Sequence, residues 1–129
     1  MTKVLVDSSV WIAFFKGTED GRLLFPLLDA NLVCVNDLIQ AELIPSLRHK
    51  KELTLARLLM SIEKTPLRID WNDIVAMQTA NLKNGLNRVG VPDLIIAQNA
   101  LQHALPLFSF DKHREIMKKS FGLILFTTN

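Results

Sequence analysis

The sequence lacks most features that would mark a secreted, membrane-bound or strongly basic protein. Its single cysteine, Cys34, excludes an internal disulfide and suits a reducing compartment. The formal net charge of +2 is too small to indicate a nucleic-acid-binding protein by itself. No apolar run reaches the roughly 20 residues that a membrane-spanning helix needs, and the apolar residues 4–15 contain Asp7 and lack a usual signal-peptide cleavage site. We therefore expect a soluble, cytoplasmic protein that does not enter a membrane.

The composition is ordinary for a globular protein. The chain has 129 residues, of which 49% are apolar and 22% charged, enough to bury an apolar core without structural zinc. It contains no internal repeat, no low-complexity segment and no linker. We therefore expect a single domain over residues 1–129, with Cys34 buried as a small apolar side chain.

Short apolar runs alternate with segments of helical spacing along the chain. Strands are predicted at residues 3–7, 32–35, 67–69, 106–110 and 123–126. Helices are predicted over residues 10–15, 21–28, 38–47, 52–64, 71–86, 92–103 and 111–120. Their expected caps include Ser8 or Ser9, Asn36 or Asp37, and Asp70. This alternation predicts an α/β fold, a three-layer α/β/α sandwich around a central, mainly parallel sheet.

Four acidic residues fall where such a fold brings distant segments together. Asp7 ends the first strand and Asp111 follows the strand at 106–110, so both lie at the rim where parallel strands end. Asp93 opens a helix, and helices leaving that rim begin there too. Glu42 lies on or beside the buried stripe of its helix, where a carboxylate needs a partner.

Each acid also has a structural explanation. Asp7 and Asp111 can cap helices, Asp93 is favoured by the dipole of a first helical turn, and Glu42 can reach solvent or a nearby basic residue. These explanations do not account for four acids predicted to meet at one rim, where they would repel one another. A divalent cation relieves that repulsion, and oxygen ligands select Mg²⁺ or Mn²⁺ over zinc. The positions therefore predict a site for one of these ions.

Four short motifs carry a family resemblance, namely VLVDSSVWI at 4–12, AEL at 41–43, PDLIIA at 92–97 and FSFDKH at 108–113. In this order and spacing they resemble the PIN-domain family, in particular the VapC-type toxins of toxin–antitoxin pairs. The resemblance implies a metal-dependent endoribonuclease that hydrolyses RNA, is neutralised by a cognate antitoxin and forms a homodimer. It places Asp7, Glu42, Asp93 and Asp111 at the catalytic metal-binding positions and gives Ser8 a supporting role, although Ser8 as a helix cap needs none.

Two positions depart from the family pattern. Many relatives have another acid where this chain has His113, and commonly an aromatic residue where it has Arg114. His113 is therefore either a contact for the RNA phosphate or a surface histidine. The candidates for contacts with the RNA backbone are Lys83, Arg88, Lys112 and Arg114, which flank the segments of Asp93 and Asp111.

Three other functions remain as alternatives. A haloacid-type phosphatase needs a second aspartate two positions after Asp7, where this chain has Ser9. A receiver-like signalling domain needs a lysine at the end of a later strand, and none is evident. A PIN-like domain that binds RNA or a partner without cleaving is the nearest alternative, and the presence of all four acids argues against it.

Overall fold

The centre of the fold is a parallel sheet, seen here in a computed structural model that describes residues 2–128. Its strand order is β3-β2-β1-β4. The strands are β1 (Val4–Val6), β2 (Val33–Val35), β3 (Glu63–Lys64) and β4 (Leu107–Phe108). Val4 pairs with Val33, Leu5 with Leu107, and Cys34 with Glu63, all in parallel register. This confirms the predicted mainly parallel sheet.

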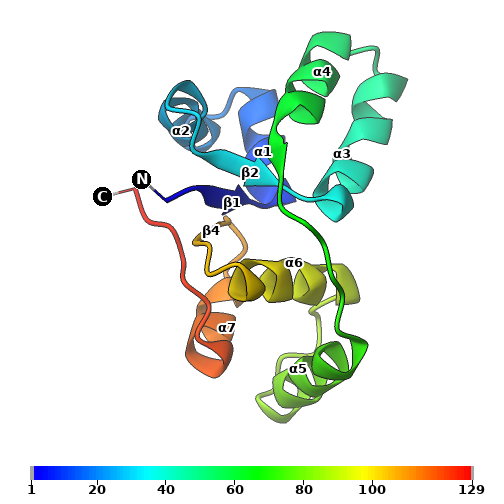
Figure 1. The fold of residues 1–129 in the computed structure, drawn as a ribbon, viewed down its shortest axis with the longest axis vertical. Helices are drawn as coiled ribbons and strands as arrows, with labels where there is room; N and C mark the ends of the chain where they lie inside the picture. Colours follow the sequence, from blue (N-terminus) through cyan, green and yellow to red (C-terminus); the bar gives the residue numbers. More distant parts are fainter. Residues whose placement is uncertain (1, 129) are drawn as a thin grey trace.

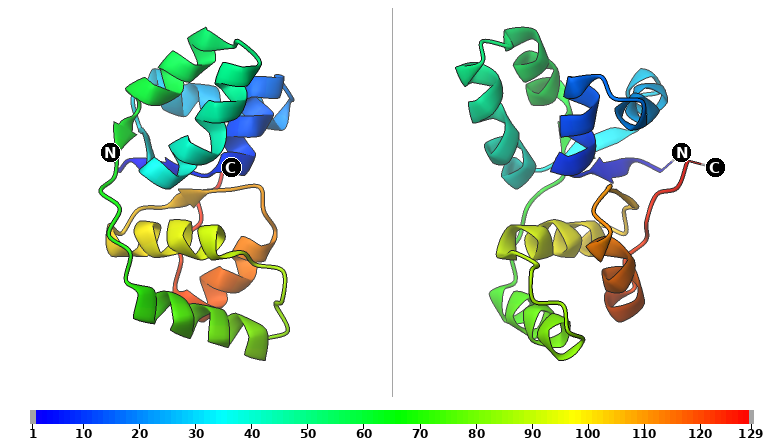
Figure 2. Two further views of the ribbon diagram at one scale, coloured as in Figure 1. Left: turned by 90° about the vertical axis from the view of Figure 1, so that its right-hand side faces the viewer. Right: turned by 180° about the vertical axis from the view of Figure 1, so that it is seen from behind.

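Helices cover both faces of the sheet (Figures 1 and 2). One layer holds α1 (Ser8–Lys16), the 3₁₀ helix η1 (Asp20–Leu24), α2 (Phe25–Asp29), α3 (Asp37–His49) and α4 (Leu53–Ser61). The other layer holds α5 (Trp71–Lys83), α6 (Val91–Gln102) and α7 (His113–Phe121). The predicted three-layer α/β/α sandwich is therefore confirmed. No helix within residues 2–128 is both long enough and apolar enough to span a bilayer.

The apolar strands β1 and β2 are buried along their whole length because helices pack on both sides of them. Trp11 and Ile39 fill the core from one layer, and Leu94 and Met117 fill it from the other, each completely buried. Cys34 is buried in β2 as expected, and this burial raises the pKa of its thiol.

The predicted caps are found at the starts of α3 and α5, but the prediction that Ser8 or Ser9 caps the first helix is wrong, because both lie inside α1 and Asp7 caps it. The Asp7 side chain accepts a hydrogen bond from the backbone of Ser9 at the start of α1. Asn36, rather than Asp37, caps α3, and its side-chain amide also donates to Asn99 of α6. Asp70 caps α5 as expected. These caps fix where the helices leave the sheet, which is what positions the residues at its rim.

The third strand was misplaced by the sequence pattern. A helix was expected to run to residue 64 with a strand at 67–69, but α4 ends at Ser61 and the strand is Glu63–Lys64. This edge strand has two exposed, charged side chains, so no apolar run marks it. It is held instead by backbone pairing with β2 and by an ion pair between Glu63 and Lys3.

The expected strand at 123–126 is reduced to one parallel bridge, between Leu125 and Leu107. The other predicted elements are present with shifted ends. The strand predicted at 106–110 is only Leu107–Phe108, and the helix predicted over 21–28 is divided between η1 and α2.

Replacement of Gly21 by alanine tests the packing of η1 on α1. A Cβ atom at this buried residue would overlap the carbonyl group of Ala13 and the nitrogen of Phe14. We expect Gly21→Ala to lower the free energy of unfolding by about 1–3 kcal/mol, measured by urea denaturation. Gly90→Ala is the control, because its Cβ would find only ordinary contacts. A loss for Gly21→Ala no larger than that of the control would contradict this packing.

Candidate functional site

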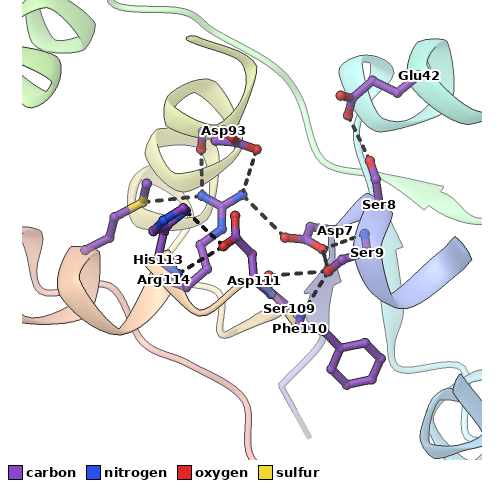
Figure 3. Close-up of polar contacts among 11 residues, drawn as sticks. Asp7, Ser8, Ser9, Glu42, Asp93, Ser109, Phe110, Asp111, His113 and Arg114 are labelled. Atoms are coloured by element: carbon purple, nitrogen blue, oxygen red, sulfur yellow. Dashed lines mark hydrogen bonds and ion pairs between the residues drawn. The ribbon is translucent and has the colours of Figure 1, made fainter. Parts of the chain in front are cut away.

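Three acids and one arginine meet where β1 and β4 end and three helices begin (Figure 3). Asp7 follows β1, and Asp111 lies beyond the end of β4. Asp93 is in the first turn of α6, and Arg114 is in the first turn of α7. The side chains of these four residues point toward one another in Figure 3. The sequence predicted that four acids meet at one rim, and the structure places three of them here, without Glu42.

Asp7 is the most deeply buried acid of the site, with 4% of its surface exposed. Its Oδ1 accepts hydrogen bonds from the backbone nitrogen of Ser9 (2.9 Å) and from the Ser9 hydroxyl (2.5 Å). Its Oδ2 lies 3.4 Å from Nη2 of Arg114. One carboxylate oxygen therefore caps α1, and the other faces the centre of the site.

Arg114 supplies a positive charge among the acids. Its guanidinium is buried, with the residue 2% exposed, and Nη2 lies between Oδ2 of Asp7 and Oδ1 of Asp93, at 3.4 and 3.6 Å. Nη1 donates to the backbone carbonyl of Asp93 (2.7 Å) and lies 3.4 Å from the sulfur of Met117. A buried arginine stays charged, so it needs these carboxylates.

The prediction that Arg114 meets the RNA backbone is wrong as it stands, because a guanidinium so deeply buried cannot line a surface groove. The sequence pattern did not show that a residue of the last helix reaches the end of the first strand. The other three basic candidates, Lys83, Arg88 and Lys112, are exposed.

Asp111 begins the turn into α7 and is partly exposed. Its Oδ1 accepts from the backbone nitrogen of His113 (3.0 Å) and lies 3.2 Å from Nδ1 of the same histidine. His113 is likewise partly exposed, with 32% of its side chain accessible. The histidine therefore belongs to the edge of the site as a partner of Asp111.

Glu42 lies apart from the other acids. It is exposed on α3 and lies beside the buried stripe that includes its neighbour Leu43, but it does not join the other three acids as predicted. Its Oε1 accepts a hydrogen bond of 2.8 Å from the hydroxyl of Ser8. Figure 3 shows the pair on the α3 side of the site, with Ser8 between Glu42 and the rest. Ser8 thus links Glu42 to the site.

Ser9 is a site residue whose part the sequence did not reveal. Its hydroxyl donates to Asp7 and accepts from the backbone nitrogen of Phe110 at 2.9 Å. The Ser109 hydroxyl lies 3.5 Å away and accepts from the backbone nitrogen of Asp111. Ser9 therefore ties the start of α1 to the loop that carries Asp111.

The side chains can be compared with what a divalent ion requires. Carboxylate oxygens are the donors that Mg²⁺ and Mn²⁺ prefer. Within residues 2–128, however, no three acidic, histidine or cysteine side chains are placed to share one ion. The guanidinium of Arg114 lies between two of the acids instead. As they stand, these residues do not fit a bound divalent cation.

Comparison with known proteins gives the class of this fold. The structure is a parallel α/β sandwich with an acidic rim, and the PIN domain family model matches residues 4–119. The chain belongs to the PIN domain family. No curated protein matches the sequence.

Several solved structures share the fold. VapBC2 from Rickettsia felis, solved with a DNA fragment from its promoter, is 17% identical, with a TM-score of 0.69 over 97% of this chain and 98% of that chain. VapBC-5 from Mycobacterium tuberculosis, of the VapBC family of toxin–antitoxin systems, is 20% identical, with a TM-score of 0.68 over 99% and 100%. FitAcB from Neisseria gonorrhoeae is 19% identical, with a TM-score of 0.62 over 96% of each chain.

Replacement of Ser9 by alanine tests whether its hydroxyl stabilises the contact between the start of α1 and the loop that carries Asp111. Ser9→Ala removes a donor to Asp7 and leaves the backbone nitrogen of Phe110 without its acceptor. We expect a loss of about 1–3 kcal/mol in the free energy of unfolding, measured by urea denaturation. In the control Ser61→Ala, an exposed hydroxyl loses only a local bond to Leu58, and we expect a change within about 0.5 kcal/mol. Equal losses in the two variants would contradict this role.

Proposed function

We propose that this chain is a VapC-type toxin, an endoribonuclease that hydrolyses RNA phosphodiester bonds and is neutralised by a cognate antitoxin. The observation that carries the proposal is the acidic rim, where Asp7, Asp93 and Asp111 meet at the ends of parallel strands. Membership of the PIN domain family and the shared fold with VapBC and FitAcB structures support it.

We assign the three acids different roles because their side chains differ in exposure to solvent. The side chain of Asp93 is 40% accessible and that of Asp111 is 31% accessible, whereas that of Asp7 is 5% accessible. Of these three acids, we assign Asp93 and Asp111 to the activation of the attacking water, because their exposed carboxylates can accept its proton as it attacks phosphorus. Asp7, bonded to Ser9 and facing Arg114, orients the rim.

The reaction forms a bond between the water oxygen and phosphorus and breaks the bond from phosphorus to O3′. The proton of the water passes to a carboxylate, and the departing 3′ oxygen takes a proton from solvent. The products are a 5′-phosphate and a 3′-hydroxyl. Because RNA is anionic, we assign its backbone to the exposed Lys83, Arg88 and Lys112, and the phosphate near the rim to His113.

We also propose that RNA cleavage by this protein requires Mg²⁺ or Mn²⁺. All four acids, including Glu42 beside Ser8, are donors of the type these ions take. No step above is assigned to a bound ion, because the acids as arranged do not share one. The requirement is settled by cleavage assays with and without EDTA.

An antitoxin and a second copy of the chain are the proposed partners, in the cytoplasm. Four large apolar side chains are exposed on η1, α2 and α4, at fractions of 40–62%, and offer surfaces for them: Leu23, Phe25, Leu53 and Met60.

A second candidate function is a PIN domain that binds RNA or a partner without cleaving. The observation that favours it is Arg114, which neutralises part of the acidic rim where an aromatic residue is common in the family. The two candidates differ in whether RNA is broken.

Purified protein mixed with RNA separates the two candidates. We expect cleavage with Mg²⁺ or Mn²⁺ that EDTA abolishes, and a loss of about 100-fold or more in Asp93→Asn and Asp111→Asn. Asp7→Asn should also lose cleavage, with reduced stability because Arg114 then faces only one carboxylate. Asp29→Asn, an exposed acid at the end of α2, is the control and should cleave like the unchanged protein. Intact RNA in every arm would favour the non-cleaving domain.

Growth tests the toxin assignment separately. Induced expression in a bacterium should arrest growth and break cellular RNA, and co-expression of the product of the neighbouring upstream gene should restore growth. Asp93→Asn should be harmless at an equal protein level. Normal growth with the unchanged protein, or arrest by Asp93→Asn, would contradict a nuclease toxin.

A further inference from the structure

The buried guanidinium of Arg114 is an internal cation for the acidic rim. The carboxylate of Asp7 is buried here, and a buried negative charge is costly without a positive partner. Arg114 provides that partner from within the chain, as Asp7 and Asp93 both face its Nη2. A divalent cation held by the same oxygens would bring a second positive group to the same place, where the two repel each other.

The position of Arg114 is explained by the acids and not by its own helix. It lies in the first turn of α7, where the helix dipole disfavours a positive charge. It is also completely enclosed, although arginine is mostly exposed in proteins. Both disadvantages are offset by the two carboxylates and by the backbone carbonyl of Asp93.

The contacts of Arg114 with the two carboxylates are nevertheless long, whereas its bond to the backbone carbonyl of Asp93 is short, at 2.7 Å. Its distances to the carboxylate oxygens, 3.4 and 3.6 Å, exceed the 2.7–2.9 Å typical of a charge-assisted hydrogen bond. Both carboxylates face the same Nη2 atom, so neither pair is bidentate, and the buried Nε has no partner among the described residues. The guanidinium therefore gives each of these two carboxylates only one long contact.

We propose that Arg114 closes the acidic rim to divalent cations, so that an ion binds only when the guanidinium withdraws from Asp7 and Asp93. Arg114 is thus a positioning residue that lowers the affinity of the site for Mg²⁺ and Mn²⁺. The inference rests on the proposed function in one respect, since it takes the acids to bind such an ion when the protein acts. It accounts for the mismatch between the donor type of these residues and their present arrangement.

Binding of Mn²⁺ to the RNA-free protein, measured by isothermal titration calorimetry, tests this proposal. Arg114→Met removes the charge but fills similar space, and we expect it to bind Mn²⁺ about tenfold or more tightly than the unchanged protein. Lys118→Met removes an exposed charge one turn further along α7 and is the control, expected to change the affinity less than about twofold. Equal affinities of Arg114→Met and Lys118→Met, or no binding by either, would overturn the proposal.

A measurement on the unchanged chain covers the case in which Arg114→Met does not fold. In ¹⁵N NMR spectra of arginine side chains, Mg²⁺ should move the Arg114 signal toward that of a solvent-exposed arginine, while the exposed Arg57 stays constant. An Arg114 signal that does not change at saturating Mg²⁺ overturns the proposal. Neither experiment involves RNA, so the two proposals can fail separately. A tenfold gain in Mn²⁺ affinity in a protein that does not cleave RNA would reject the proposed function and keep this inference. Cleavage of RNA without that gain would keep the proposed function and reject this inference.

Discussion

The structure depends on a buried charge contact between the first strand and the last helix. Asp7 ends β1 at the middle of the sheet, and Arg114 reaches it from the first turn of α7. Removing one member of such a buried pair costs about 3–5 kcal/mol, because the other charge stays without a partner. The same contact positions Asp93, whose carboxylate and backbone carbonyl both face the guanidinium. Stability and the chemistry of the rim are therefore set by the same atoms.

The sequence predicts the layers of the fold well because their causes are local. The apolar runs of β1 and β2 mark strands covered on both faces, and Asn36 and Asp70 mark helix starts. The edge strand β3 was missed, because its pairing with β2 comes from backbone hydrogen bonds and its side chains, Glu63 and Lys64, are exposed. Periodicity shows burial, and an edge strand without burial leaves no such mark.

The sequence predicted the acidic residues of the site but not the positive charge of Arg114 that lies among them. Strand order and the rule for parallel sheets suffice to bring Asp7 and Asp111 to one rim. They do not show that Glu42 turns to solvent beside Ser8, or that Arg114 folds inward, since both depend on side-chain directions. The departure from the family pattern at Arg114 was visible in the sequence, but its consequence required the packing of α7 against β1.

Anomalous diffraction from crystals grown without divalent ions and then soaked in Mn²⁺ tests the central claim most directly. Our account predicts guanidinium density between Asp7 and Asp93 before the soak. After it, an anomalous peak should lie among the acids, with Arg114 withdrawn. A manganese peak among these acids with Arg114 still in contact with both, or an ion-free crystal with Arg114 in solvent, would contradict it.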